Sequence, residues 1–154
     1  MLDTCTIEER WTGVSQLIER WLQERQELIV QYCAVSGIHG IGQNEPLSND
    51  RLTNLCQILV DYVSAGHFEV YYQLILEAEA FGDGSEEAAQ ELLPRITATT
   101  GIAMEFHDAY IEANDENPKL SQHLSKLGEV LEARFSLEDQ LIDSLHESHR
   151  TAVA

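Results

Sequence analysis

The sequence has few of the residues that point to catalysis, to a metal site or to export. Its 154 residues include only three cysteines, Cys5, Cys33 and Cys56, which are too widely spaced for a Cys-x-x-Cys pair. An odd, scattered set is typical of reduced thiols in a cytosolic protein. The first residues are acidic and amphipathic rather than a signal peptide, and no apolar run approaches the ~20 residues that span a bilayer. We therefore expect a cytoplasmic protein without a membrane segment.

Basic residues are also scarce, because nine Lys and Arg stand against 27 Asp and Glu, which gives a net charge of −18. The acids are concentrated in residues 77–116, where Arg95 is the single base. Binding to nucleic acid or to an anionic membrane requires a basic surface, so we expect neither partner. A negative field would instead speed the encounter with a basic protein, although acids that only maintain solubility would produce the same composition.

The sequence contains no clear strand pattern and no internal repeat, and its apolar residues recur at helical spacing. Four such runs cover about residues 8–35, 52–81, 85–113 and 118–149, separated by polar or glycine-rich breaks. Long helices with short connections favour antiparallel neighbours. The predicted fold is all-α, an up-and-down antiparallel four-helix bundle with long helices, in a single domain over residues 1–154.

Local signals predict where these helices begin and end. The expected boundary residues are Gly37 after the first helix, Ser48, Asn49 or Asp50 as the cap of the second, and Ser85 as the cap of the third. Pro94 lies about nine residues into the third helix, past the first turn where proline is tolerated. It should therefore kink that helix or mark its true start.

The second helix is apolar on two opposite sides. Its core stripe continues in one phase through Gly66, which indicates one long helix: Leu52, Leu55, Cys56, Leu59, Tyr62, Val63, Gly66, Val70, Leu74 and Phe81. A helix that is only half-buried would be polar on the other side. That side instead carries Asp61, Ser64, Ala65, Phe68, Tyr72 and Ile75. It should contact either a partner or another part of the chain, such as segment 36–50 or the first helix.

Charged residues fall within the apolar stripes of the first and fourth helices. Arg25 lies in the first, and Arg134 and Glu138 lie four residues apart in the fourth. Because an isolated buried charge costs several kcal/mol, we expect Glu138 to lie between the two arginines. One of three further residues would complete this buried polar network: Glu77, His67 or Tyr110. The alternative is that the long arginine side chains reach out of the stripe to solvent.

Residues 67–72 and 134–139 are similar to the His-Phe-x-x-Glu-Glu helical signature of hemerythrin-like metal bundles. In the first segment, Tyr71 and Tyr72 replace the carboxylates, and in the second, Arg134 replaces the histidine with a fixed cation that would repel a metal. No Ser/His/Asp or Cys/His arrangement stands out. We therefore expect no catalysis, metal or other cofactor. A degenerate hemerythrin-like metal-binding or sensor four-helix bundle is the alternative.

Three segments resemble the regulator of sigma D family (Rsd/AlgQ): Arg20-Trp21-Leu22 with Arg25, residues 59–71 (LVDYVSAGHFEVY) and residues 131–142 (LEARFSLEDQLI). The resemblance covers nearly the whole chain and is weakest in segments 36–50 and 77–116. It implies a bacterial cytoplasmic anti-sigma factor that regulates transcription. Such proteins bind region 4, the DNA-reading domain of the primary (sigma-70 type) sigma factor, and keep it from core RNA polymerase and the −35 promoter element. Family members are also linked to a phosphocarrier protein of the sugar phosphotransferase system and to the ppGpp synthetase/hydrolase.

The resemblance and the residues together suggest which surface binds. Region 4 carries a basic helix-turn-helix, and an acidic bundle with outward apolar residues suits such a target. Apolar anchors would supply affinity, and acids would supply rate and discrimination. The expected partner-binding residues are Asp61, Ser64, Ala65, Phe68, Tyr72 and Ile75. An interaction bundle with a different partner remains an open alternative.

Overall fold

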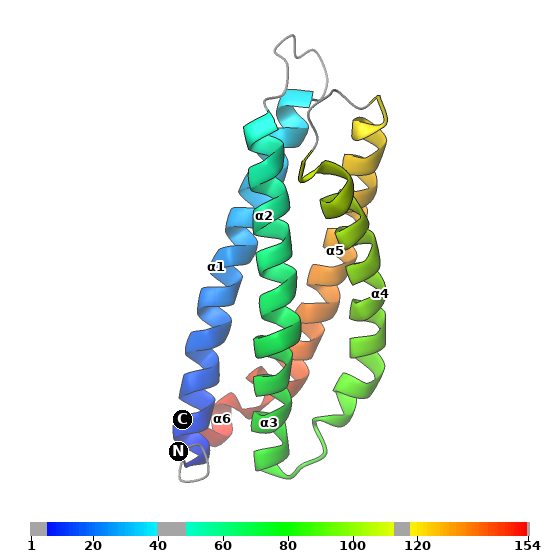
Figure 1. The fold of residues 1–154 in the computed structure, drawn as a ribbon. Helices are drawn as coiled ribbons and strands as arrows, with labels where there is room; N and C mark the ends of the chain where they lie inside the picture. The colour runs from blue at the N-terminus through cyan, green and yellow to red at the C-terminus, as the bar shows by residue number, and fades with distance from the viewer. Residues whose placement is uncertain (1–5, 40–48, 113–117, 154) are drawn as a thin grey trace.

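The computed structural model describes residues 6–39, 49–112 and 118–153, and the regular elements in these ranges are all helices (Figure 1). Four long stretches form the body: α1 (Ile7–His39), α2 (Asn49–Ala65) continued by α3 (Tyr71–Phe81), α4 (Glu87–Tyr110) and α5 (Leu120–Leu145). They run alternately up and down (Figure 1), so the predicted all-α antiparallel four-helix bundle is confirmed. A 3₁₀ turn (Glu147–His149) and the short helix α6 (Arg150–Val153) follow α5.

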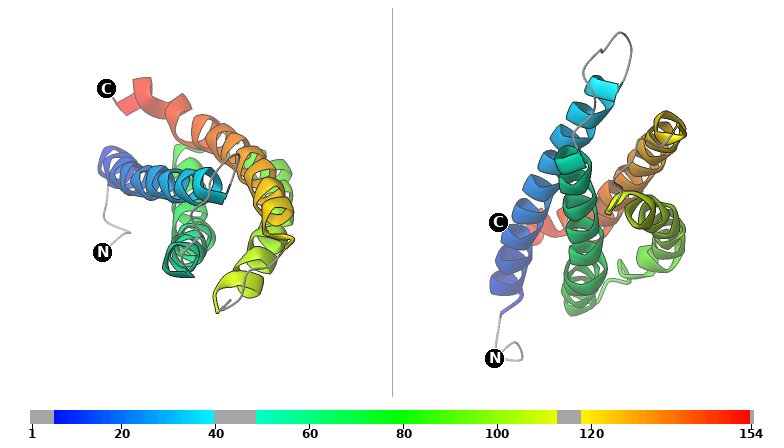
Figure 2. Two further views of the ribbon diagram at one scale, coloured as in Figure 1. Left: turned by 90° about the horizontal axis from the view of Figure 1, so that it is seen from above. Right: turned by 45° about the horizontal axis from the view of Figure 1, so that its top comes forward.

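The helices are arranged as two neighbouring pairs, α1 with α2 and α4 with α5 (Figure 2). Contacts of α2 with α4, and of α5 with α1 and α3, join the pairs. The core between them is made of fully buried aliphatic side chains that include Leu28, Leu55, Leu59, Leu74, Ile96, Leu127 and Leu141. No helix in the described ranges has an apolar stretch long enough to cross a membrane.

The ends of α1 differ from the prediction. Thr6 caps the start, since its Oγ1 accepts a hydrogen bond from the Glu9 N–H at 3.0 Å. At the other end, α1 continues through Gly37 to His39, so the expectation that Gly37 ends the helix is wrong. The second stretch begins at Asn49, so the predicted caps Asn49 and Asp50 lie inside the helix, and the third, Ser48, lies outside the described residues.

The turn between α3 and α4 is built by glycines rather than by a serine cap. Gly82 and Gly84 adopt positive φ angles of 68° and 80°, which favour glycine. The Ser85 N–H donates to Asp83 Oδ1 at 3.0 Å, and no side chain caps α4. The prediction of Ser85 as the cap is therefore wrong. The helix also continues through Pro94, which excludes the alternative that Pro94 marks its start.

The last long helix ends at Leu145 rather than at His149, because the chain turns to contact α1 and α3. The carbonyl oxygen of His146 accepts a hydrogen bond from Trp11 Nε1 at 3.1 Å. The His146 imidazole ring also stacks on the Trp11 ring, with the two centroids 4.4 Å apart. The His146 Nδ1 and Glu77 Oε1 atoms are 2.6 Å apart, and both residues are buried. These contacts hold the carboxyl-terminal segment against the base of the bundle.

A π-turn, Gly66–Val70, joins α2 to α3. Its defining hydrogen bond runs from the Tyr71 N–H to the Gly66 carbonyl, five residues back. The helical stretch is continuous, but the expectation of one unbroken phase through Gly66 is wrong. A π-turn inserts one residue into an α-helix and rotates all later residues of the helix by about 100°. As a result Tyr71, which is absent from the predicted core stripe, is only 3% exposed.

The π-turn depends on the missing side chain of Gly66. A Cβ atom at this position would lie 2.9 Å from Tyr71 Oη and 3.2 Å from Trp21 Cζ2. The Tyr71 ring therefore crosses directly over Gly66, and no larger residue fits without displacing it.

We expect Gly66→Ala to lower the free energy of unfolding by about 1–3 kcal/mol, because the new methyl group overpacks the Tyr71 and Trp21 rings. Urea unfolding followed by circular dichroism measures this. Gly101→Ala is the matched control, since Gly101 lies within α4 with no atom within 4 Å of a built Cβ. It should stabilise the helix by about 0.5–1 kcal/mol. Equal effects of the two changes would contradict the proposed overpacking.

Candidate docking surface and the buried network behind it

The outward side of the α2–α3 stretch carries the two most exposed aromatic side chains of the described residues. Phe68, in the π-turn, is 84% exposed, and Tyr72, in the first turn of α3, is 58% exposed. Asp61 is exposed as well. The other three residues of the predicted stripe are partly buried: Ser64, Ala65 and Ile75. Since Ala65 and Ile75 pack against the core, the open surface is narrower than the predicted one.

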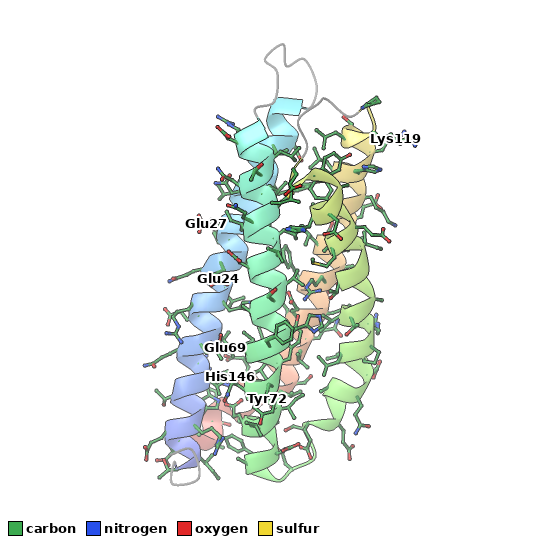
Figure 3. The ribbon with its side chains drawn as sticks, viewed as in Figure 1. Glu24, Glu27, Glu69, Tyr72, Lys119 and His146 are labelled. Atoms are coloured by element: carbon green, nitrogen blue, oxygen red, sulfur yellow. The ribbon has the colours of Figure 1, made fainter. Side chains whose placement is uncertain are left out.

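Three carboxylates, from α1, α2 and the π-turn, lie near Glu24, and one of them, Glu69, follows Phe68 directly in the π-turn. Figure 3 labels Glu24 and Glu27 on α1, and Glu69 and Tyr72 on the adjacent helical stretch. The pKa of the Glu24 carboxyl is raised, first by partial burial and then by the negative charges of Asp61, Glu69 and Glu27. These three carboxylates are therefore close enough to Glu24 to repel its negative charge, and a cation would relieve that repulsion. We call this set of four carboxylates, with Phe68 and Tyr72, the acidic–aromatic surface.

A shallow cleft extends this surface along the junction between α1 and the π-turn. Its lining residues are Glu9, Arg10, Gly13, Val14, Leu17, Arg20, Glu69 and Gln73. Val14 is buried and Leu17 partly buried, so the cleft has apolar as well as charged walls. Because Glu69 belongs both to the cleft and to the acidic–aromatic surface, the two form one continuous area.

A buried polar network centred on Glu138 of α5 holds together the helices that carry this surface. The Glu138 carboxylate is fully buried. Its Oε1 accepts from the Tyr62 hydroxyl at 2.6 Å, and its Oε2 from the Tyr71 hydroxyl at 2.5 Å. Arg25 Nη2 lies 3.4 Å from Oε1, and Arg134 Nε lies 3.2 Å from Oε2. The structure thus places Glu138 between the two arginines, with a tyrosine on each oxygen.

Arg134 is fully buried and donates hydrogen bonds to α3, α4 and α5. Its Nη1 donates to Thr99 Oγ1 at 3.0 Å and to Thr100 Oγ1 at 2.8 Å. Its Nη2 donates to the Tyr71 hydroxyl at 3.0 Å. The alternative that this arginine reaches solvent is therefore wrong. A guanidinium with this many acceptors satisfies the requirement that a buried charge be paired and hydrogen-bonded.

Arg25 closes the network at its outer edge, where its side chain is 12% exposed. Its Nε donates to the Tyr62 hydroxyl at 3.0 Å, and its Nη1 pairs with Asp139 Oδ1 at 2.7 Å. The guanidinium carbon also lies 4.8 Å from the centroid of the Phe135 ring. The network therefore contains two arginines, Arg25 and Arg134, and two carboxylates, Glu138 and Asp139, so its charges balance.

The three residues expected to complete the network have different positions. His67 joins it indirectly, because its Nε2 lies 2.8 Å from the Thr100 Oγ1 that also binds Arg134. The other two lie elsewhere: Glu77 pairs with His146, and Tyr110 bonds His123 at 2.5 Å.

Tyr62 and Tyr71 belong to the network although the sequence did not predict them there. The two tyrosines are nine residues apart. In an uninterrupted α-helix they would point in opposite directions, about 180° apart, so helical spacing gives no signal that they share an acceptor.

The network is suited to alignment of the helices rather than to chemistry. The pKa values of Tyr62 and Tyr71 are both raised, first by burial and then by the charge of Glu138. The phenols therefore remain protonated and act as hydrogen-bond donors. The buried polar groups of the network come from α1, α2, α3, α4 and α5, so a change in alignment of any helix would break a hydrogen bond.

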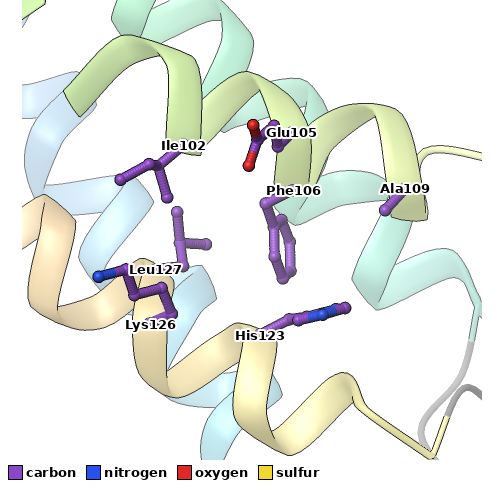
Figure 4. A pocket seen from close by; sticks show the side chains of 7 residues that line it. All are labelled: Ile102, Glu105, Phe106, Ala109, His123, Lys126 and Leu127. Atoms are coloured by element: carbon purple, nitrogen blue, oxygen red, sulfur yellow. The ribbon is translucent and has the colours of Figure 1, made fainter. Parts of the chain in front are cut away.

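A second surface feature, a mainly apolar pocket, lies between α4 and α5 (Figure 4). Ile102, Phe106 and Leu127 form its apolar wall, and its other lining residues are Glu105, Ala109, His123 and Lys126. In the described ranges, no three His, Cys, Asp or Glu residues gather in an arrangement that could hold a metal.

We expect Glu138→Ala to lower the free energy of unfolding by about 3–5 kcal/mol, because it leaves Arg134 buried without its counter-charge. Asp139→Asn is the control: its side chain is 58% exposed, so losing the pair with Arg25 should cost less than about 1 kcal/mol. Urea titrations of both variants measure the difference. Similar losses would show that Glu138 has no special role.

The pKa of His67 is lowered from its ordinary value of 6.5 by burial and by the positive charge of Arg134. The unfolded chain therefore binds a proton more readily than the folded chain just below pH 6.5. His67 contributes stability that is complete above that pH and is lost as the pH falls through the lowered value. NMR titration of the His67 ring protons should give a midpoint below 6.5, and His67→Gln should weaken the pH dependence of the urea midpoint. A midpoint at or above 6.5 would contradict this.

Comparisons with known proteins identify the family. The family described as "Regulator of RNA polymerase sigma(70) subunit, Rsd/AlgQ" matches residues 1–146. A "Regulator of sigma D" from Yersinia enterocolitica is 40% identical over 151 residues, 96% of this chain and 90% of the relative. A regulator of sigma D from Yersinia pseudotuberculosis is 40% identical over 96% of this chain and 89% of its own length. One from Enterobacter sp. (strain 638) is 40% identical over 89% of this chain and 84% of its own length. No solved structure matches the chain. The chain therefore belongs to the Rsd/AlgQ family of regulators of the RNA polymerase sigma(70) subunit.

Proposed function

We propose that this protein is a cytoplasmic anti-sigma factor that binds region 4 of the primary sigma factor. By occupying region 4 it prevents the contacts of sigma with core RNA polymerase and with the −35 promoter element. The protein acts by binding, without catalysis. Family membership supports a regulator of sigma(70). The observation that carries the choice of surface is the 84% exposure of Phe68 next to Glu69, one of the carboxylates that interact with Glu24.

Charge complementarity supports a basic partner. Region 4 reads DNA through a basic helix-turn-helix, whose cationic side chains otherwise bind phosphate. In this complex the carboxylates of Glu24, Glu27, Asp61 and Glu69 would take the place of phosphates. A net charge of −18 would also steer a basic domain toward the protein. Because one basic face cannot bind carboxylates and DNA phosphates together, binding and promoter recognition exclude each other.

Apolar contact supports affinity at the same place. Burying an exposed phenylalanine contributes about 1.5–3 kcal/mol, which corresponds to about 10- to 100-fold in Kd. Tyr72, 58% exposed, would add a second anchor with a polar tip. The helices that present these residues are fixed by the Glu138 network, so little ordering is required on binding.

We expect Phe68→Ala to weaken the binding of purified sigma region 4 by about 10- to 100-fold, because it removes the central apolar anchor. Isothermal titration calorimetry gives the affinity, and circular dichroism verifies that the variant is folded. Val30→Ala is the matched control, since Val30 is 52% exposed on α1 and outside the acidic–aromatic surface.

The electrostatic part of the same surface is tested by Asp61→Ala, with the exposed Asp108 of α4 as control (Asp108→Ala). The Asp61 change should slow association, while the Asp108 change should have little effect. Wild-type binding by both Phe68→Ala and Asp61→Ala, with folding intact, would overturn the assignment of this surface.

A further inference from the structure

The π-turn holds one residue more than the surrounding helix requires. Tyr62 and Tyr71 both donate to the Glu138 carboxylate, at 2.6 and 2.5 Å. Nine α-helical steps would separate them by about 180°, whereas eight would separate them by about 80°, close enough for a shared acceptor. The alignment of α2 with α3 therefore corresponds to eight α-helical steps, and the ninth residue is accommodated by the π-turn.

The extra residue lies on the outer side of the turn. Gly66 and Val70, the first and last residues of the turn, are both buried. His67 is partly buried and bonded to Thr100 of α4. Only Phe68 and Glu69, between them, are exposed. An α-helical turn with the same buried positions would have room for one outward residue here, whereas the π-turn presents two neighbours.

Phe68 and Glu69 differ in chemistry, and together they complement a lysine or arginine side chain. Phe68 offers an exposed aromatic ring, and Glu69 offers a carboxylate at the edge of the cleft formed with α1. A lysine or arginine side chain has an apolar stem that packs on a ring and a cation that is attracted to both the ring face and a carboxylate. Glu24 interacts electrostatically with both Glu69 and Asp61, so these neighbouring charges would reinforce the attraction.

We propose that the π-turn is a one-residue insertion that displays Phe68 and Glu69 as a pair, and that this pair receives a lysine or arginine side chain of the basic partner. The inference rests on the proposed function for the identity of the partner. It goes further in naming the contact and in assigning a binding role to an irregularity of the helix. Irregular π-turns are often retained at functional sites.

Single-residue deletions test the insertion directly. Deleting either Phe68 or Glu69 should convert the π-turn into an α-turn while both tyrosines remain on Glu138. Both deletion variants should unfold cooperatively, with Tm within about 5 °C of the wild type. Deleting the exposed Ala98 from the uninterrupted helix α4 is the control, because it rotates all later residues of that helix by about 100°. It should lower Tm by more than about 10 °C. If the Phe68 and Glu69 deletions destabilise as much as the Ala98 deletion, the insertion model is wrong.

Binding of sigma region 4 tests the pair. Each deletion should weaken the affinity about tenfold or more, and so should Glu69→Gln, which retains the π-turn. Glu91→Gln, at an exposed site on α4, should leave the affinity unchanged. Wild-type affinity for both Glu69→Gln and the Glu69 deletion would overturn the pair, even where Phe68→Ala still weakens binding and the proposed function stands. If the wild-type protein does not bind region 4, the proposed function and the identity of the pair's partner are both overturned. The unfolding experiment on the deletion variants would still decide whether the π-turn is an insertion.

Discussion

The carboxylate of Glu138 is shielded from water by the whole bundle, and its burial is acceptable only because four donors surround it. Tyr62, Tyr71, Arg25 and Arg134 each approach one of its two oxygens, from the first, second and fourth helical stretches. Arg134 then extends the connection to threonines of α4. A buried ion pair of this kind contributes less to net stability than to specificity, since most misaligned packings would leave a charge unpaired. The alignment of the four helices follows from that requirement.

The same requirement shapes the outer surface. Placing two tyrosines, nine residues apart, on one carboxylate requires a π-turn, and Gly66 permits it because the Tyr71 ring occupies the space of a Cβ atom. The turn thus aligns Tyr62 and Tyr71 on Glu138 inside the bundle. Its outer side carries Phe68, the most exposed aromatic residue of the described chain. Core alignment and surface display are therefore coupled through five residues. This coupling links the helical irregularity to the binding role proposed for an Rsd/AlgQ protein.

Much of the architecture is predictable from the residues alone. Apolar spacing predicts four long helices and their antiparallel order, because short polar breaks leave few other ways to bury the stripes. The cost of burying charge predicts that Arg25, Arg134 and Glu138 need one another, and the structure places them together. The two-sided character of residues 52–81 also indicates an outward aromatic surface, which the exposure of Phe68 and Tyr72 matches.

Other features depend on contacts between segments that are distant in the sequence. Glu77 binds His146 rather than the arginines, and the contact of His146 with Trp11 ends α5 early. Neither pairing has a signal in local spacing. The sequence also gives no signal for the π-turn, because its extra residue satisfies no local preference. The turn is stabilised instead by the hydrogen bonds of Tyr62 and Tyr71 to Glu138 of another helix. The sequence by itself therefore determined the helices, their buried faces and the negative charge. Only the tertiary structure decided the phase of α3 and the partners of each buried polar group, because side chains from several helices must meet before these are set.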